Sequence, residues 1–163
     1  SNTASSMDLT VANVLTQFDA DMQAMTENRV PTAGRLLYVI PSVYTLIKNA
    51  QSIQRQFDVQ NNQAVINRMV NSLDQVEIQQ VPPELMKTAY DFTQGWKPGT
   101  SAKQIQMLLI HPGAVITPVS YEAVRLDPPS AVTQNKYYYY EESFMDVFIL
   151  NKKASAIRFT VAA

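Results

Sequence analysis

The sequence contains no cysteine, one histidine and only four glycines. Without cysteine it forms no disulfide, has no thiol nucleophile and builds no zinc-thiolate site. A single histidine also excludes metal sites made of two or three imidazoles. The four glycines lie far apart, and neither G-x-G-x-x-G nor G-x-x-x-x-G-K-[ST] occurs. The phosphate-binding loops that depend on these motifs are therefore not expected.

The sequence also has little charge and no long apolar run. Charged residues make up 17% of the 163 residues, and the formal net charge is −1. A nucleic-acid or anionic-membrane surface needs a concentrated basic face, so neither is expected as a partner. No apolar run approaches the roughly 20 residues that span a bilayer, and no signal-peptide pattern opens the chain. The 46% of hydrophobic residues suffice for one buried core.

Residues 1–8 are expected to be a disordered or cloning-derived tail, because the first six are small and polar. A helix with one apolar face is predicted next, capped by Thr10 or Asp8. Its apolar positions follow helical spacing: Val11, Val14, Leu15, Phe18, Met22 and Met25.

Two segments share a pattern in which a buried strand runs directly into a proline. The apolar run 36–40 ends at Pro41, and the run 105–110 is followed by His111 and Pro112. Proline suits the first helical position, so each segment predicts a strand, a sharp turn and a helix. We expect the two strands to be neighbours in one covered sheet.

Two further segments are less regular. Residues 73–81 alternate in polarity, which predicts a strand with one face buried. Residues 51–71 are rich in asparagine and glutamine. They are interpreted either as a loop or as a surface that pairs through side-chain amides, and their periodicity does not decide between the two.

The last third of the chain changes character after Asp127-Pro128-Pro129. Residues 137–150 and 155–161 are rich in aromatic and β-branched residues, and they flank a turn at 151–153. This pattern predicts a long antiparallel hairpin between the two segments. A long β-arm of this kind is a place to look for partners.

Candidate catalytic groups are few. His111 is the one histidine, and its position between a buried strand and Pro112 favours a structural role. Glu142 and Asp146 share one face of a strand while Glu141 points to the other, and a solvated face explains these acids better than acid-base catalysis. The run of tyrosines 137–140 is interpreted as core or interface, since acids rather than bases follow it. No catalytic, cofactor-binding or metal residue, and no cofactor, is therefore assigned.

Several motifs, taken in order, resemble the major capsid proteins of tailed bacteriophages, whose fold was first described in phage Hong Kong 97. They are Gly34-Arg35-Leu36-Leu37-Tyr38-Val39-Ile40-Pro41-Ser42-Val43-Tyr44, Ile66-Asn67-Arg68, Val81-Pro82 and Ile110-His111-Pro112-Gly113-Ala114-Val115-Ile116. The resemblance covers roughly Thr10 to Val161. It includes the tyrosine-rich stretch and the terminal segment 146–161.

The resemblance implies an α+β fold, with an axial-domain sheet flanked by helices and a long C-terminal antiparallel hairpin. Residues 9–130 would form the axial-type α/β domain, and residues 131–163 the hairpin that returns toward the peripheral domain. The N-terminal arm, the extended loop and the spine helix of that family have no counterpart in this chain. We therefore expect it to be part of a larger subunit.

The function that the resemblance implies is structural: a phage or prophage capsid subunit that assembles with copies of itself into pentamers and hexamers around the genome. A scaffolding protein and a portal are implied as further partners, and the virion, assembled in the bacterial cytoplasm, as the location. No specific nucleic-acid sequence and no membrane are expected as partners. Two alternatives stay open: an encapsulin-like compartment shell, and an enzyme that uses His111 with Glu142 or Asp146.

Overall fold

The computed structural model describes residues 4–50, 53, 69–93 and 95–163. Most of the amide-rich segment 51–71 lies outside them, so its interpretation stays a prediction. The chain divides into two compact units, which are described separately. Residues Ser1–Ala114 together with Lys152–Ala163 form the sheet unit, and Val115–Asn151 form the hairpin unit.

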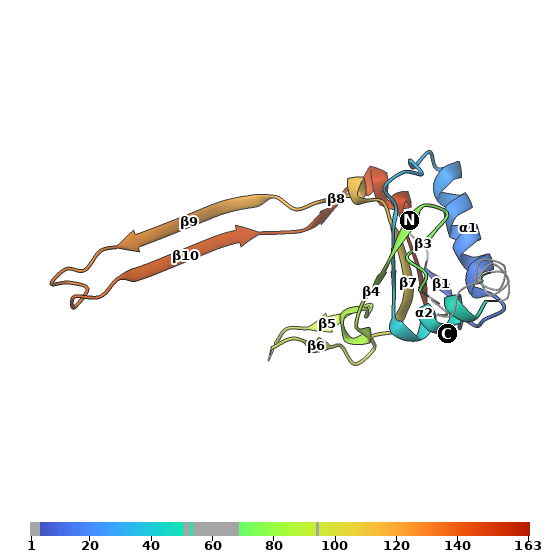
Figure 1. Cartoon of the computed structure of the whole chain (residues 1–163), viewed down its shortest axis with the longest axis horizontal. Helices are drawn as coiled ribbons and strands as arrows, with labels where there is room; N and C mark the ends of the chain where they lie inside the picture. Colours follow the sequence, from blue (N-terminus) through green and yellow to red (C-terminus); the bar gives the residue numbers. More distant parts are fainter. Residues whose placement is uncertain (1–3, 51–52, 54–68, 94) are drawn as a thin grey trace, which may run out of the picture. The chain divides into compact units, whose positions relative to one another are not determined.

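The sheet unit is built on a mixed six-stranded sheet with the strand order β1-β12-β7-β2-β4-β3 (Figure 1). The pairs β1–β12 and β2–β4 are parallel, and the others are antiparallel. The strands are β1 (Ser5–Ser6), β2 (Leu36–Val39), β3 (Ser72–Leu73), β4 (Val76–Gln80), β7 (Ile105–Ile110) and β12 (Ile157–Val161).

The two predicted strand-proline segments are confirmed as neighbours in this sheet. β2 pairs with β7, with Leu37 opposite Leu109. Both of these side chains are fully buried, as the continuous apolar runs predict. Pro41 opens the helix α2 (Pro41–Asn49), and Pro112 opens a single 3₁₀ turn, η2 (Pro112–Ala114). Proline is tolerated at both sites because its missing N–H would have no helical acceptor there.

The first helix, α1 (Val14–Glu27), begins three residues later than its apolar pattern predicts, and neither Thr10 nor Asp8 caps it. The Asn13 side chain instead forms hydrogen bonds within the turn that precedes the helix. Its Oδ1 accepts the N–H of Thr10 at 2.6 Å, and its Nδ2 donates to the carbonyl of Asp8 at 3.1 Å. This local bonding competes with helical continuation over residues 10–13. The buried face of α1 consists of Val14, Phe18, Asp21 and Met25.

Two further expectations need correction. The predicted disordered tail contains a strand, because Ser5 and Ser6 pair with Thr160 and Val161 and so satisfy one edge of β12. The predicted strand 73–81 is interrupted, because residues 74 and 75 adopt positive φ and form the turn between β3 and β4.

The hairpin unit consists of β8 (Val115–Ile116), β9 (Val119–Asp127), β10 (Tyr138–Met145) and β11 (Phe148–Ile149). A long antiparallel hairpin exists, but it pairs β10 with β9, and β11 pairs with β8. The predicted pairing of 137–150 with 155–161 is wrong. β12 buries residues on both of its faces and pairs with β7 in the sheet. The boundary predicted after residue 130 falls in the connection between β9 and β10, and the axial-type assignment of 9–130 stays a prediction.

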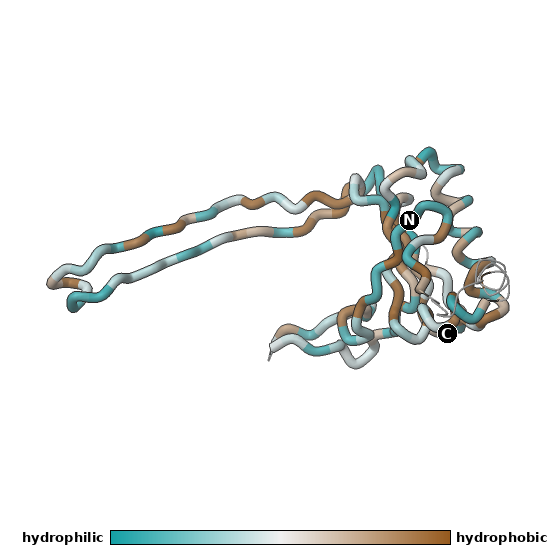
Figure 2. Tube along the Cα trace, viewed as in Figure 1, coloured by the Kyte–Doolittle hydropathy of each residue, from teal (hydrophilic) through white to brown (hydrophobic). Residues whose placement is uncertain are grey.

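The described residues also form four shorter elements: η1 (Pro83–Leu85), β5 (Tyr90–Asp91), β6 (Lys97–Pro98) and η3 (Asn151–Ala156). Figure 2 shows apolar residues along the central strands of the sheet unit and also along the two strands of the hairpin unit. Only in the sheet unit are such residues buried.

Arg35 is a buried cation that ties α1 to β2, and its side chain is 1% exposed. Its Nε donates to the carbonyl of Pro31 at 2.9 Å, and its Nη2 donates to that of Val30 at 2.8 Å. Its Nη1 donates to the carbonyl of Met22 at 3.1 Å, within the last turns of α1. Burial lowers the pKa of the guanidinium. The cation stays charged because carbonyls at the negative end of the helix replace its water.

We predict that Arg35→Lys lowers the free energy of unfolding by about 2 kcal/mol and that Arg35→Ala lowers it by about 4 kcal/mol. Lysine keeps the charge but has no planar fork, so it satisfies fewer of these carbonyls. Urea unfolding followed by circular dichroism measures both values. The exposed Arg125→Ala is the control and is expected within about 0.5 kcal/mol of the wild type. A loss below about 1 kcal/mol for Arg35→Ala would contradict the anchoring role.

Two carboxylates of the sheet unit, Asp19 of α1 and Asp74 of the β3–β4 turn, line one shallow hollow. Burial raises the pKa of Asp19, and the charge of Asp74 raises it further. A folded-state pKa above the unfolded value favours folding at low pH, and this contribution is lost as pH rises through the folded pKa.

We therefore predict that Asp19→Asn raises the melting temperature at pH 7 and leaves it unchanged near pH 3, where the wild-type carboxyl is protonated. The gain is at most about 2 °C because Asp19 is solvent-exposed. Thermal unfolding at both pH values checks it, with the exposed Glu84→Gln as the matched control. An equal gain at both pH values would show that ionisation of Asp19 is not the cause.

Candidate functional site

The candidate catalytic residues are divided between the two units. His111 belongs to the sheet unit, whereas Glu142 and Asp146 belong to the hairpin unit. The His111 Nδ1 accepts the backbone N–H of Gly113 at 3.1 Å and so caps the η2 turn. Asp146 lies between β10 and β11, where it accepts the N–H of Val147. The strand alternation that would place Asp146 on the face of Glu142 therefore stops before it.

Among the described residues, no three histidine, aspartate or glutamate side chains gather closely enough to hold a metal ion. No helix in that part of the chain has the length and apolar character needed to cross a membrane.

The hairpin unit carries most of the exposed apolar surface. In the described part of the chain, fifteen of the twenty exposed large apolar or aromatic side chains lie within residues 115–151. No residue of this unit is buried. Soluble monomers rarely expose a contiguous apolar patch on this scale, and such patches mark interaction sites. The exposed set is Ile116, Val119, Tyr121, Val124, Leu126, Val132, Tyr137, Tyr138, Tyr139, Tyr140, Phe144, Met145, Val147, Phe148 and Ile149.

The register of β9 and β10 sorts these side chains onto two faces, because residues directly opposite each other share a face. The first, which we call the aromatic face, carries Tyr121, Tyr138, Tyr140 and Phe144. The rings of Tyr121 and Phe144 pack across the strands with centroids 5.8 Å apart. The second, the mixed face, carries Val124, Leu126, Tyr139 and Met145. Both faces are therefore apolar enough to pack against a partner.

Carboxylates lie among the tyrosines on each face. The hydroxyl of Tyr139 donates to Glu141 at 2.7 Å, and the hydroxyl of Tyr140 donates to Glu142 at 2.5 Å. The bond to Glu141 raises the pKa of Tyr139, and the bond to Glu142 raises the pKa of Tyr140. These pairs orient the tyrosine rings along the strand. They account for the acids after the tyrosine run without any acid-base chemistry.

A second, smaller exposed group lies in the sheet unit at β5 and β6. Trp96 stacks on Tyr90 with centroids 5.3 Å apart, and Phe92 lies beside the same ring. The Tyr90 hydroxyl accepts the N–H of Lys87 and donates to the carbonyl of Glu84, which fixes the ring. Phe92 and Trp96 are nevertheless exposed, at 72% and 46%.

Comparison with solved structures identifies the fold. The chain is similar to a chain from a structure of Mycobacterium phage Che8, with a TM-score of 0.58 and 9% identity over 98% of this chain and 52% of that one. In the capsid structure of Cyanophage P-SCSP1u the match has a TM-score of 0.65 and 14% identity, over 95% and 47% of the two chains. In the mature capsid of bacteriophage PhiM1 it has a TM-score of 0.62 and 12% identity, over 94% and 47%.

No protein-family model matches the chain, and no curated protein is similar to it in sequence. The chain spans about half the length of the solved chains that it matches. At these identities the likeness establishes the fold. The predicted phage capsid protein fold, α+β with a multi-stranded sheet and few helices, is confirmed.

Proposed function

We propose, from this phage capsid fold, that the chain is part of a major capsid protein, a structural subunit that assembles with copies of itself into a shell. The observation that carries the proposal is the hairpin unit, which exposes fifteen large apolar side chains and buries none. Two of the three structures compared above are described as phage capsids. A shell subunit needs extended surfaces that become buried only on assembly.

The energetics of a two-stranded ribbon support this role. An isolated antiparallel pair is at best marginally stable in water, because it has no third layer to cover its faces. β9 and β10 are nine and eight residues long, and their side chains are solvated on both faces. Packing against neighbouring chains supplies the missing layer and removes that apolar surface from water. Assembly and ordering of the hairpin are thus coupled.

The composition suits many repeated contacts. With a net charge of −1 and only 17% charged residues, copies of the chain repel each other weakly. We propose pentamers and hexamers as the assembly units, a scaffolding protein and a portal as further partners, and the virion, assembled in the host cytoplasm, as the location. These finer assignments rest on the family resemblance.

The remaining alternatives receive less support. An encapsulin-like compartment would use the same self-association, but the three structures compared above come from phages. An enzyme would need His111 to act with Glu142 or Asp146, and these residues belong to different compact units. The contacts of each are accounted for locally, by the η2 turn, Tyr140 and Val147. We therefore propose a non-enzymatic role.

The full-length protein, expressed with any scaffold it needs, is expected to form closed shells that electron microscopy detects. We predict that Leu126→Asp lowers the yield of shells at least about tenfold. A carboxylate buried in an interface costs more than the 1.4 kcal/mol that a tenfold change in affinity represents. The melting temperature of the sheet unit is expected to stay within about 1 °C, since Leu126 lies outside it.

Leu85→Asp is the matched control, because it makes the same replacement at an exposed leucine of the sheet unit, 57% exposed against 61% for Leu126. It is expected to leave the shell yield within about twofold. An equal loss of shell yield in both variants would show that the hairpin unit is not the contact surface between subunits. An absence of shells or capsomer rings from the full-length wild type would overturn the proposed function itself.

A further inference from the structure

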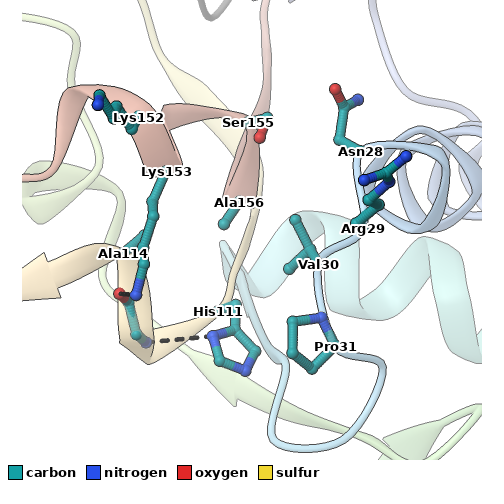
Figure 3. A pocket seen from close by; sticks show the side chains of 11 residues that line it. Asn28, Arg29, Val30, Pro31, His111, Ala114, Lys152, Lys153, Ser155 and Ala156 are labelled. Carbon is teal, nitrogen blue, oxygen red and sulfur yellow. Dashed lines mark hydrogen bonds between the residues drawn. The ribbon is translucent and has the colours of Figure 1, made fainter.

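The sheet unit contains a cavity of about 190 Å³ whose lining includes Arg29, Lys152, Lys153 and His111 but no acidic residue. Figure 3 shows Arg29 beside the end of α1, the two lysines on the opposite side at η3, and His111 below. We call it the basic pocket. Three positive charges without a carboxylate among them favour an anionic occupant.

The backbone conformation of Arg29 lowers the stability of the fold. The end of α1 is a Schellman motif, in which the N–H of Arg29 donates to the carbonyl of Thr26 and that of Val30 donates to the carbonyl of Met25. The motif requires a left-handed residue at Arg29, whose φ is 61°. Glycine adopts that conformation without strain, whereas a side chain with a Cβ does not. The backbone strain at Arg29 is compatible with a use for its charge in the pocket.

The opposite side of the pocket is held by a short chain of hydrogen bonds. Lys153 Nζ donates to the carbonyl of Gly113 at 3.3 Å, and the N–H of Gly113 donates to His111 Nδ1 at 3.1 Å. Since Nδ1 accepts a bond, the imidazole proton lies on Nε2, which makes His111 a further donor. The approach is close, because a Cβ on Gly113 would lie 3.1 Å from that Nδ1. Lys153 and His111 are thus held in place on this side of the pocket.

The hairpin unit carries the complementary charge. It contains five carboxylates and only two basic residues, whereas the sheet unit contains eleven basic and nine acidic residues. Glu141 and Glu142 are consecutive in β10 and lie on opposite faces, so each face presents one of these two carboxylates. Each of them accepts one tyrosine hydroxyl bond, which leaves oxygen lone pairs for further donors.

We propose that the basic pocket of one copy receives a carboxylate from the hairpin unit of a second copy, Glu141 or Glu142. This contact rests on the proposed shell function and specifies its interface. A phosphate of nucleic acid is the weaker candidate. Phosphate backbones need a row of basic residues along an extended face, and this cluster is confined to one small pocket in a chain of net charge −1.

The test uses two charge-reversed forms of the chain. The pocket variant carries Lys152→Glu and Lys153→Glu, and the hairpin variant carries Glu141→Lys and Glu142→Lys. Each alone places like charges at the contact, whereas an equimolar mixture pairs opposite charges between copies. We expect the mixture to associate at least about tenfold more tightly than either variant alone, and to lose this advantage between about 50 mM and about 300 mM salt. Sedimentation velocity measures both.

Three results would overturn the contact. One is a mixture no tighter than its components. Another is recovery only when all four substitutions are in one chain, which would place the contact within a copy. The third is a mixture that does not associate while the pocket variant loses binding to a DNA oligonucleotide, which would assign the pocket to phosphate. Lys87→Glu with Lys103→Glu, made in the sheet unit outside the pocket, is the matched control and should associate as the wild type does.

A second variant covers the case in which charge reversal disturbs folding. Arg29→Gly relieves the left-handed strain and removes one pocket charge. We expect it to raise the melting temperature by about 2–4 °C and, with the hairpin unit left wild-type, to weaken association between copies about fivefold relative to the wild type. A purely structural Arg29 would leave association unchanged, which would count against the proposal. Shells formed by the full-length wild type would in that case leave the proposed function intact.

Discussion

The antiparallel pairing of β7 with β12 is the contact on which the arrangement of the rest of the chain depends. Ile110 lies opposite Ile157, and the N–H of His111 donates to the carbonyl of Ala156 at 3.0 Å, immediately beyond the strands. The hairpin unit therefore leaves the sheet and re-enters it at one place. Closing a long loop adds little entropy cost per extra residue, so a sheet with this junction tolerates a large insertion. The sheet supplies the stability of the fold. The inserted hairpin unit can therefore present an exposed surface without contributing to that stability.

The parts of this fold that could be predicted are those that local chemistry specifies. Proline after an apolar run marked the ends of β2 and β7, because its missing N–H and fixed φ act within a few residues. The pairing of β12 could not be predicted in the same way. A segment with apolar residues on both faces suits either a hairpin or a central sheet, and its partner lies about fifty residues earlier in the chain. Sequence proximity favoured the wrong neighbour.

Neither the burial of Arg35 nor the exposure of the hairpin unit, the candidate site, could be predicted from the sequence. Nothing in the sequence indicates that Arg35 is buried, since its acceptors are main-chain carbonyls, which every residue possesses. β9 and β10 carry large apolar residues on both faces among their charged ones, and a surface covered by a partner needs such residues just as a surface covered by the chain's own core does. The pattern of apolar residues indicates only that these faces become buried against something. The structure is needed to show that the chain's own core does not bury them.

A shell interface built on the hairpin would have a definite energetic character. Ordering a two-stranded ribbon that has no core costs conformational entropy, and this cost is deducted from the free energy gained when its apolar faces are covered. The net strength of each contact is then modest even where the buried area is large. Charge pairing at a pocket adds a modest net affinity, and it rejects incorrect registers because like charges repel. Because each apolar contact is weak and like charges repel in an incorrect register, misplaced subunits can dissociate before the shell closes.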